Sequence, residues 1–181
     1  MYRILVTGKS SFIGRAFQAR CADFPDRYRV DAISLRGSAW RAADFSGYDA
    51  VVHAAGIAHV RARDAMEGAY MAVNRDLAVD VAQKAKAAGV SQFLFLSSML
   101  VYGSPAPAGK SRVIDARTAP APENAYARSK LFAEEGIRAL EGDGFRAAIL
   151  RPPMVYGKGC RGNYQTLAIW ARRLPLFPNI E

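Results

Sequence analysis

Hydrophobic positions at the start of the chain follow two spacings in turn, that of a buried strand and that of an amphipathic helix. The run Tyr2–Thr7 is apolar at its centre and predicts a first strand. Turn residues at 8–11 interrupt this run, and Phe12–Asp23 then carries apolar side chains at helical spacing. The chain is therefore predicted to open with a strand, a tight turn and a helix.

The same alternation continues to the end of the sequence. Further strands are predicted at Tyr28–Leu35, Ala50–Ala54, Ser91–Ser97 and Phe145–Leu150, with a weak third element at Trp40–Phe45. Further helices are predicted at Ala65–Ala88, which Gly89 ends, and at Ala125–Gly142 and Tyr164–Arg173. Strands that alternate with helices along a whole chain are typical of a parallel sheet covered on both faces. We therefore expect an α/β fold with a doubly wound parallel sheet.

Two segments show neither the strand spacing nor the helix spacing of apolar residues. The segment Ser104–Pro122 is rich in proline and contains Gly109, which predicts a surface loop that covers a site. Arg151–Asn163 is a second predicted loop.

Composition narrows the class of protein. The 181 residues are 51% hydrophobic and 23% charged, which excludes a disordered chain and fits a globular domain. No apolar run approaches the roughly 18 residues of a membrane-spanning helix, and the first residues do not resemble a secretory signal. We expect a soluble, cytoplasmic protein without a membrane partner. Cys21 and Cys160 stand far apart, outside any Cys/His cluster, so we expect reduced thiols and no metal site.

The formal net charge of +9 is spread evenly over the two halves of the chain. Charge spread in this way favours a solvated surface first and attraction to an anionic small molecule second. Because no recognised nucleic-acid motif accompanies the charge, we do not expect a nucleic-acid partner.

The first turn carries a candidate phosphate site. Gly8, Ser11 and Gly14 have the spacing of a GxxGxxG turn between a strand and a helix. Such a turn directs free backbone N–H groups and the positive end of the helix dipole at an anion, and small residues let a pyrophosphate approach. Ser11 departs from the pattern, since its side chain adds bulk where glycine allows the closest approach. An ordinary tight turn is the alternative.

A second candidate site lies in a predicted helix. Tyr126 and Lys130 are four residues apart, so both side chains project from one face. An ammonium group beside a phenol favours the phenolate and lowers its pKa, so Tyr126 can act as a proton shuttle. A surface pair is the alternative, against which stand Ser97 and Ser98 at a strand end and the small residues 54–56 at another.

With these motifs the sequence resembles the extended short-chain dehydrogenase/reductase family, specifically the NAD(P)-dependent sugar-nucleotide epimerases and dehydratases. The resemblance covers essentially the whole chain and rests on five segments: TGKSSFIG at 7–14, VVHAAG at 51–56, LSSMLVYG at 96–103, YARSK at 126–130 and RPPMVYG at 151–157. It implies a Rossmann-type dinucleotide-binding domain and a nucleotide-sugar substrate. It also implies a catalytic set of Ser98, Tyr126 and Lys130, in which Tyr126 moves the proton, Ser98 bonds the same oxygen, and Lys130 holds the nicotinamide ribose.

The cofactor-binding residues predicted in this way are Gly8, Ser10, Ser11, Phe12, Ile13, Gly14, Ser34, Arg36, Ala54, Ala55, Gly56, Tyr126, Lys130 and Pro153. The end of the second strand decides between NAD and NADP, since an acidic residue there binds the ribose hydroxyls and an arginine accommodates a 2′-phosphate. Ser34 occupies the acidic position and Arg36 follows, so we favour NADP over NAD. Asp31 is a second candidate acid for NAD, or else an ordinary strand residue.

Five other residues have less specific readings. Asn74 matches the family's helix asparagine and either supports the catalytic residues or faces solvent. We expect His53 and His59 to be structural, since neither has a partner carboxylate nearby in the sequence. Trp40 and Trp170 are predicted to be packing residues.

The family resemblance also implies domain boundaries. Residues 1–160 are predicted to form the dinucleotide-binding domain, and residues 161–181 the start of a substrate-binding lobe that is otherwise largely missing. A truncated lobe leaves turnover open, so a dinucleotide-binding module without turnover is the alternative function. By the same resemblance, Met154 stands where some epimerases carry a polar residue, which argues against the UDP-galactose epimerase subgroup. Because family relatives often dimerise through their long helices, the resemblance also implies a homodimer.

Overall fold

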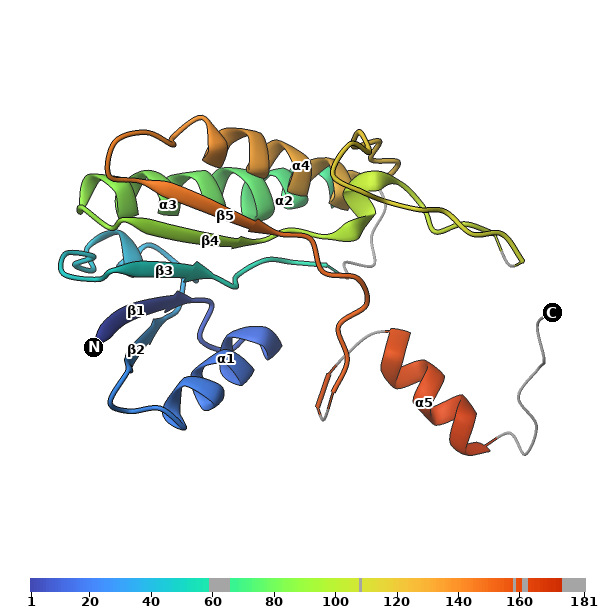
Figure 1. Cartoon of the computed structure of the whole chain (residues 1–181), viewed down its shortest axis with the longest axis horizontal. Coiled ribbons are helices and arrows are strands. Elements are labelled where there is room, and N and C mark those ends of the chain that lie inside the picture. Colours follow the sequence, from blue (N-terminus) through green and yellow to red (C-terminus); the bar gives the residue numbers. More distant parts are fainter. Residues whose placement is uncertain (59–65, 108, 158, 161–162, 174–181) are drawn as a thin grey trace.

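A five-stranded parallel sheet forms the centre of the protein (Figure 1). The computed structural model describes residues 1–58, 66–107, 109–157, 159–160 and 163–173. The strands are β1 (Tyr2–Thr7), β2 (Tyr28–Ile33), β3 (Ala50–His53), β4 (Gln92–Leu96) and β5 (Arg146–Leu150). Their order is β2-β1-β3-β4-β5, with every neighbouring pair parallel. The predicted doubly wound α/β fold is confirmed.

Helices cover both faces of this sheet. The helices of the described residues are α1 (Phe12–Ala22), α2 (Met66–Tyr70), a π-helical turn (Met71–Asp76), α3 (Leu77–Ala87), α4 (Ala125–Arg138) and α5 (Asn163–Arg173), of which α5 lies beyond the sheet. In Figure 1, α1 lies on one side of the sheet and α3 and α4 on the other. The helix predicted from residue 65 to 88 is thus three successive segments, its first residue lying outside the described part. The predicted helix end at Gly142 is wrong, because the chain turns there and Gly142 pairs with Phe145.

The alternating side chains of the strands build two cores. From β1, Ile4 and Val6 join Val52 against the α1 side. The larger core lies under α3 and α4 and takes its buried side chains from Leu5, Val51, Phe93, Phe95, Val81 and Ile137, among others. Burial of each large apolar side chain is worth about 1.5–3 kcal/mol. Because both faces of the central strands are apolar, the sheet needs helices on both sides.

The weak third element predicted at Trp40–Phe45 is not part of the sheet. The segment contains one 3₁₀ turn, Ala39–Arg41, and β3 pairs directly with β1. Trp40 and Phe45 are buried in the larger core all the same. Asp44 accepts hydrogen bonds from the backbone N–H and the hydroxyl of Ser46, so the backbone turns where a strand would continue.

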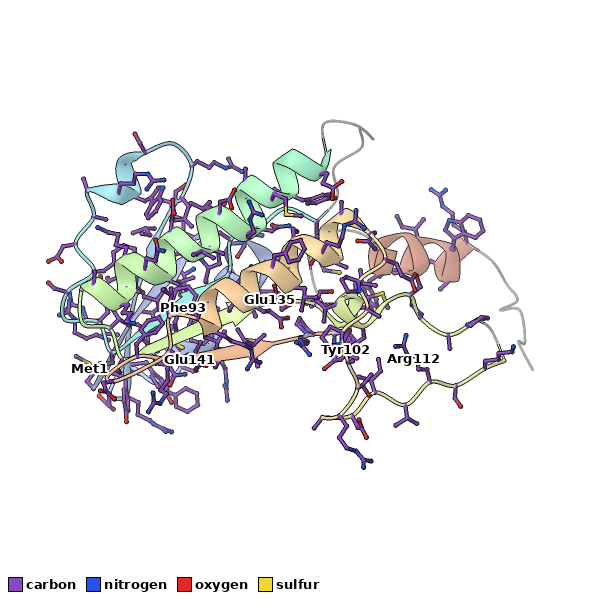
Figure 2. All side chains as sticks on the ribbon, turned by 90° about the horizontal axis from the view of Figure 1, so that it is seen from above. Met1, Phe93, Tyr102, Arg112, Glu135 and Glu141 are labelled. Atoms are coloured by element: carbon purple, nitrogen blue, oxygen red, sulfur yellow. The ribbon has the colours of Figure 1, made fainter. Side chains whose placement is uncertain are left out.

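The predicted loop Ser104–Pro122 contains no helix or strand among its described residues. Figure 2 shows Arg112 on the part of this loop that extends beyond the sheet, and Tyr102 near its base. The packing role predicted for Trp170 on α5 is wrong, since this side chain is 62% exposed. Of the helices described, none has both the length and the apolar character needed to cross a bilayer.

Candidate functional site

The turn between β1 and α1 has the geometry of an anion site. Backbone N–H groups of Gly8 and Lys9 donate to the carbonyl of Ile33, which ties the turn to the end of β2. Among bonds between described residues, the N–H groups of Phe12 and Ile13 have no partner, and they lie at the N-terminus of α1. These groups and the positive end of the helix dipole suit a phosphate.

Gly8 is where the turn requires glycine. Its φ is +93°, and a Cβ there would lie 2.7 Å from the backbone N of Ala55. The backbone of Gly8 therefore packs directly against the backbone of Ala54 and Ala55 after β3, and a side chain at residue 8 would not fit between them. Ser11 caps α1, since its hydroxyl accepts from the N–H of Gly14 at 2.9 Å. The side chain of Ser11, which departs from the glycine pattern, thus stabilises the N-terminus of α1 at the anion site.

Ser34 and Arg36 are both exposed just after β2, beside the phosphate turn. The backbone N–H of Arg36 donates to the hydroxyl of Ser34 at 3.2 Å, which leaves the guanidinium out of this turn. Asp31 lies inside β2 and accepts a hydrogen bond from the hydroxyl of Tyr48 at 3.0 Å. The structural reading of Asp31 is thereby favoured.

Asn74, in the π-helical turn, is buried and holds the chain that follows β3. Its side chain donates to the carbonyl of Ile57 and accepts from the N–H of the same residue, both at 2.9 Å. It also donates to the hydroxyl of Ser129 on α4 at 3.2 Å. The solvent-facing reading of Asn74 is wrong, because this residue is 1% exposed, and its support of the catalytic residues stays a prediction.

The ammonium group of Lys130 is buried at the carboxyl edge of the sheet. It donates to the carbonyl of Leu96 at 2.8 Å and lies 4.7 Å from the centre of the Phe95 ring. Burial lowers the pKa of Lys130 to about 8, and the carboxylate of Glu134 opposes this shift. The surface-pair reading of Tyr126 and Lys130 is therefore excluded for the lysine.

Tyr126 is half-buried in the first turn of α4, and Ser98 lies near enough to its phenol to affect the pKa of that phenol. Burial raises the pKa of Tyr126, Ser98 opposes this rise, and Tyr70 adds to it. This direction is opposite to the one expected from Lys130. The reason is geometric, because the lysine directs its ammonium at a backbone carbonyl. Tyr126 is therefore protonated at neutral pH.

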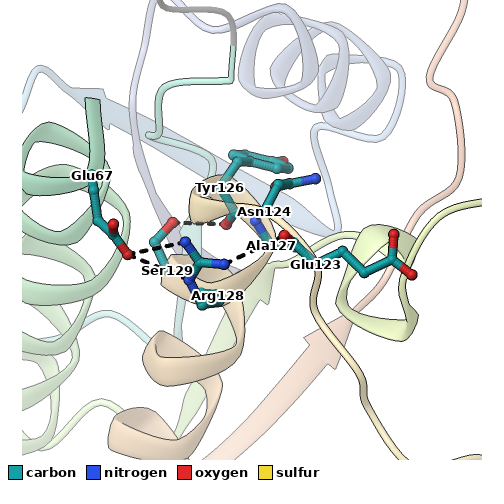
Figure 3. A network of polar contacts seen from close by, with 7 residues as sticks. All are labelled: Glu67, Glu123, Asn124, Tyr126, Ala127, Arg128 and Ser129. Atoms are coloured by element: carbon teal, nitrogen blue, oxygen red, sulfur yellow. Dashed lines mark hydrogen bonds and ion pairs between the residues drawn. The ribbon is translucent and has the colours of Figure 1, made fainter. Parts of the chain in front are cut away.

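The first turn of α4 is held on several sides (Figure 3). Asn124 caps the helix by accepting from the N–H of Ala127 at 2.8 Å, and the hydroxyl of Ser129 donates to the carbonyl of Tyr126. The guanidinium of Arg128 reaches Glu67 on α2 at 3.1 Å. Tyr126 is thus carried by a fixed helix end.

The loop after β5 closes the site from the other side. The backbone N–H of Met99 donates to the carbonyl of Pro152 at 3.1 Å, which places the exposed Pro153 next to the end of β4. A Cβ at Gly157 would lie 3.4 Å from the Phe12 ring, so this loop also reaches the phosphate turn.

Sequence reasoning missed two sets of contacts. The ring of Tyr70 meets that of Tyr126 edge-on, with centroids 5.8 Å apart. The buried carboxylate of Glu134 bonds Ser97 and Arg151, and Arg151 also donates to the hydroxyl of Tyr102. For the contacts of Glu134, the one signal in the sequence is its spacing, since it follows Lys130 by one helical turn and so lies on the same face of the helix.

His53 is buried in the core beside the site. Its Nδ1 shares a hydrogen bond with the hydroxyl of Thr7 at 2.9 Å, and its ring stacks on Phe93. Burial, assisted by the charge of Lys130, lowers the pKa of His53 to about 3. This environment favours the structural reading, and His59 lies outside the described residues. Cys21 and Cys160 are both free and buried.

The predicted site residues therefore meet at one edge of the sheet. The structure brings the phosphate turn, the small residues 54–56, Ser98, Tyr126 and Lys130 to the carboxyl ends of β1, β3 and β4. Ser34 and Arg36 flank this group at the end of β2. In doubly wound sheets this edge is where ligands bind.

Comparison with known proteins agrees with this arrangement. The chain is 32% identical over 187 aligned residues to GDP-6-deoxy-D-mannose reductase of Pseudomonas aeruginosa, which covers 95% of this chain and 58% of the reductase. It is 36% identical over 120 residues to UDP-glucose 4-epimerase of Vibrio cholerae, covering 65% of this chain and 36% of the epimerase. The chain spans about half the length of such relatives.

Solved structures give the same result. A short-chain dehydrogenase/reductase superfamily protein from Agrobacterium tumefaciens with bound NAD superposes with a TM-score of 0.69 at 27% identity, covering 83% of this chain and 48% of that one. RMD from Pseudomonas aeruginosa, complexed with NADPH, superposes with a TM-score of 0.66 at 30% identity, covering 84% and 54%. The profile of the NAD dependent epimerase/dehydratase family matches residues 4–174. The chain belongs to the NAD dependent epimerase/dehydratase family.

Proposed function

We propose that this chain is the dinucleotide-binding and catalytic part of an enzyme that epimerises, dehydrates or reduces a nucleoside-diphosphate sugar. The observation that carries the proposal is the meeting of Ser98, Tyr126 and Lys130 beside the phosphate turn. The proposal includes the division predicted from the sequence, with residues 1–160 as the dinucleotide-binding domain and residues 161–181 as the start of a substrate-binding lobe.

The residues present fit a dinucleotide. Gly8 and Gly14 stand where a Cβ would meet backbone or side-chain atoms at 2.7 Å, so the turn is compact and its N–H groups are accessible to a phosphate. Lys130 would hold the nicotinamide ribose, and Pro153 would border the ring. When bound, the dinucleotide would supply or accept the hydride.

Arg36 is the residue proposed to select the cofactor. Its guanidinium is exposed at the end of β2, where a 2′-phosphate is bound in this fold, and residues 34–43 after that strand contain no Asp or Glu. We therefore favour NADP over NAD. Among the relatives, the Agrobacterium protein holds NAD and the Pseudomonas protein holds NADPH.

Tyr126 would hold the proton that is exchanged with the sugar oxygen. Since burial raises the pKa of this phenol, Oη carries its proton at neutral pH and can give it to a carbonyl oxygen. The hydroxyl of Ser98 would bond the same oxygen and orient it. This protonation state suits the reducing direction, in which oxygen gains a proton as the sugar carbon gains the hydride.

The test compares Tyr126→Phe with the control Tyr2→Phe, which changes an exposed tyrosine on β1. Dinucleotide affinity is measured by fluorescence titration, and hydride transfer by absorbance with a panel of nucleoside-diphosphate sugars and their keto forms. Tyr126→Phe should keep the affinity and lower the transfer rate by about 10²–10⁴, the range of general acid catalysis. Equal loss of affinity and rate would contradict the proposal.

A dinucleotide-binding module without turnover is the second candidate. It is favoured over an enzyme that works in the oxidising direction, because the ammonium of Lys130 is directed at the carbonyl of Leu96 and the neutral phenol of Tyr126 is a poor base. In that case the wild type binds NADP or NAD and transfers no hydride in either direction.

A further inference from the structure

A buried carboxylate lies beneath the proposed catalytic residues. Glu134 is 1% exposed and follows Lys130 by one turn of α4. It accepts a hydrogen bond from the hydroxyl of Ser97 at the end of β4 and an ion pair from Arg151 just after β5. Nε of Arg151 lies 3.0 and 3.2 Å from the two carboxylate oxygens. One side chain thus joins a helix to the ends of two strands.

Ser97 stands between two residues that the proposed catalytic set uses. The carbonyl of Leu96 accepts from Nζ of Lys130 at 2.8 Å, and Ser98 lowers the pKa of the nearby Tyr126 phenol, which burial raises. The N–H of Ser97 donates to the carbonyl of Leu150 at 2.7 Å, so the segment is also held from β5. A shift of Ser97 would move both neighbours.

Arg151 completes the arrangement at its far side. Its Nη1 donates to the hydroxyl of Tyr102 at 2.5 Å, and its guanidinium lies 4.8 Å from the centre of that ring. Tyr102 ends the 3₁₀ turn Met99–Tyr102, which begins directly after Ser98. The carboxylate therefore braces the segment 96–102 at both ends.

We propose that Glu134 is a positioning residue that, through Ser97, fixes the segment Leu96–Ser98 and so sets the places of Lys130 and Ser98. The inference deepens the proposed function and rests on it. Stability alone gives no reason for this group, because a buried ion pair adds little compared with apolar packing of the same volume. Positioning does give a reason for a carboxylate here, because its directional bonds to the ends of two strands fix a geometry that apolar contacts would leave adjustable.

The phenol of Tyr126 reports on this geometry. The groups that shift its pKa are Ser98, which lowers it, and Tyr70 on α2, which raises it along with burial. Lys130 directs its ammonium at Leu96; burial lowers the pKa of this ammonium and the carboxylate of Glu134 on the same helix raises it, while the charge of Lys130 acts in turn on His53 of β3. Ser97→Ala changes none of these charges and removes only the hydrogen bond between the Ser97 hydroxyl and the carboxylate of Glu134.

The experiment measures the pKa of Tyr126 in the protein without added ligand, by NMR of tyrosine labelled with ¹³C at Cζ, with Tyr126→Phe for assignment. Ser97→Ala should raise this pKa by about half a pH unit or more, because Ser98 no longer stabilises the phenolate. Ser97→Thr, which keeps a hydroxyl, should restore the wild-type value. The control Val81→Ala lowers stability from within the larger core and should leave the pKa unchanged.

An unchanged pKa in Ser97→Ala would overturn the proposal, and so would an equal shift in Val81→Ala. If Ser97→Ala does not fold, Glu134→Asp takes its place, because it keeps the charge, withdraws the carboxylate and should give the same rise. Dinucleotide affinity is measured separately on the wild type. Failure to bind NADP or NAD would end the proposed function and leave the titration result standing.

Discussion

Gly56 and Lys130 are coupled, since the missing side chain of the first makes room for the ammonium of the second. A Cβ at residue 56 would lie 3.3 Å from Nζ of Lys130 and 3.1 Å from Oδ1 of Asn74. Few contacts of a real Cβ are that close, so either neighbour would have to move. Gly56, the last residue of the VVHAAG segment, therefore leaves space for the ammonium of Lys130 as well as for a cofactor at this edge of the sheet.

Gly56→Ala is expected to weaken dinucleotide binding about tenfold, which corresponds to about 1.4 kcal/mol, by displacing the lysine that would hold the ribose. Fluorescence titration with NADP and NAD measures the affinity. The matched control is Gly68→Ala on α2, where a Cβ meets open space. That variant should bind normally and gain up to about 1 kcal/mol in unfolding free energy. Normal binding by Gly56→Ala would show that this approach is unimportant.

Alanine variants of Gly8 and Gly89 distinguish the cost of backbone strain from the cost of steric crowding. Both glycines have positive φ, +93° and +79°, but a Cβ at residue 89 meets nothing within 4 Å. Gly89→Ala should therefore cost only the left-handed conformation, about 1–2 kcal/mol of unfolding free energy. Gly8→Ala should cost about 1–3 kcal/mol more, because its Cβ would clash with the backbone of Ala55. Urea denaturation measures both, and equal losses would refute the crowding argument.

His53 is expected to make the fold sensitive to acid. Its pKa is about 3 in the folded protein against 6.5 for an unperturbed histidine, so the unfolded chain takes up the proton first as the pH falls. Stability should therefore be full above pH 6.5 and decline below it, by up to about 1.4 kcal/mol per pH unit, until the pH approaches 3.

Denaturation at several pH values tests this decline. In His53→Asn the loss between pH 6.5 and 5 should be smaller than in the wild type. Thr7→Val removes the hydrogen bond to the ring and keeps the histidine, so it should retain the slope. Parallel profiles for the wild type and His53→Asn would assign the acid sensitivity to other groups.

Arg36 is expected to decide the cofactor preference. Arg36→Ala should lower the affinity for NADP about tenfold or more, because a charge-assisted hydrogen bond is worth about 1.5–3 kcal/mol, and leave the affinity for NAD unchanged. Arg20→Ala, in the exposed last turn of α1, is the control. If NADP affinity is unaffected, the interpretation of the end of β2 is wrong.

Local pattern was enough to predict much of the fold. The strand spacing of Tyr2–Thr7, the turn at Gly8 and the helix from Phe12 all agree with the structure, because each depends on neighbours in the sequence. The segment Trp40–Phe45 misled the same reasoning, since its aromatic residues enter the core from a connection outside the sheet. Burial alone does not distinguish the two cases.

Contacts between distant segments were harder to anticipate. Glu134 is of a residue type that usually faces solvent, and only the folded chain shows that Ser97 and Arg151 enclose its carboxylate. The pKa of Tyr126 was predicted in the wrong direction for a similar reason. The i to i+4 spacing gave the proximity of Lys130 and not the carbonyl of Leu96 that engages its ammonium.

The π-helical turn Met71–Asp76 has a consequence for how this chain tolerates changes in length. A π turn is one residue wider than an α turn, so it resembles a single insertion absorbed within a continuous helix. Deleting one residue there would allow an ordinary α-helix to form while the following segment kept its apolar stripe on the core. The amide of Asn74 would then lose its place opposite Ile57. The extra residue of the π-helical turn thus sets the position from which Asn74 holds the chain after β3.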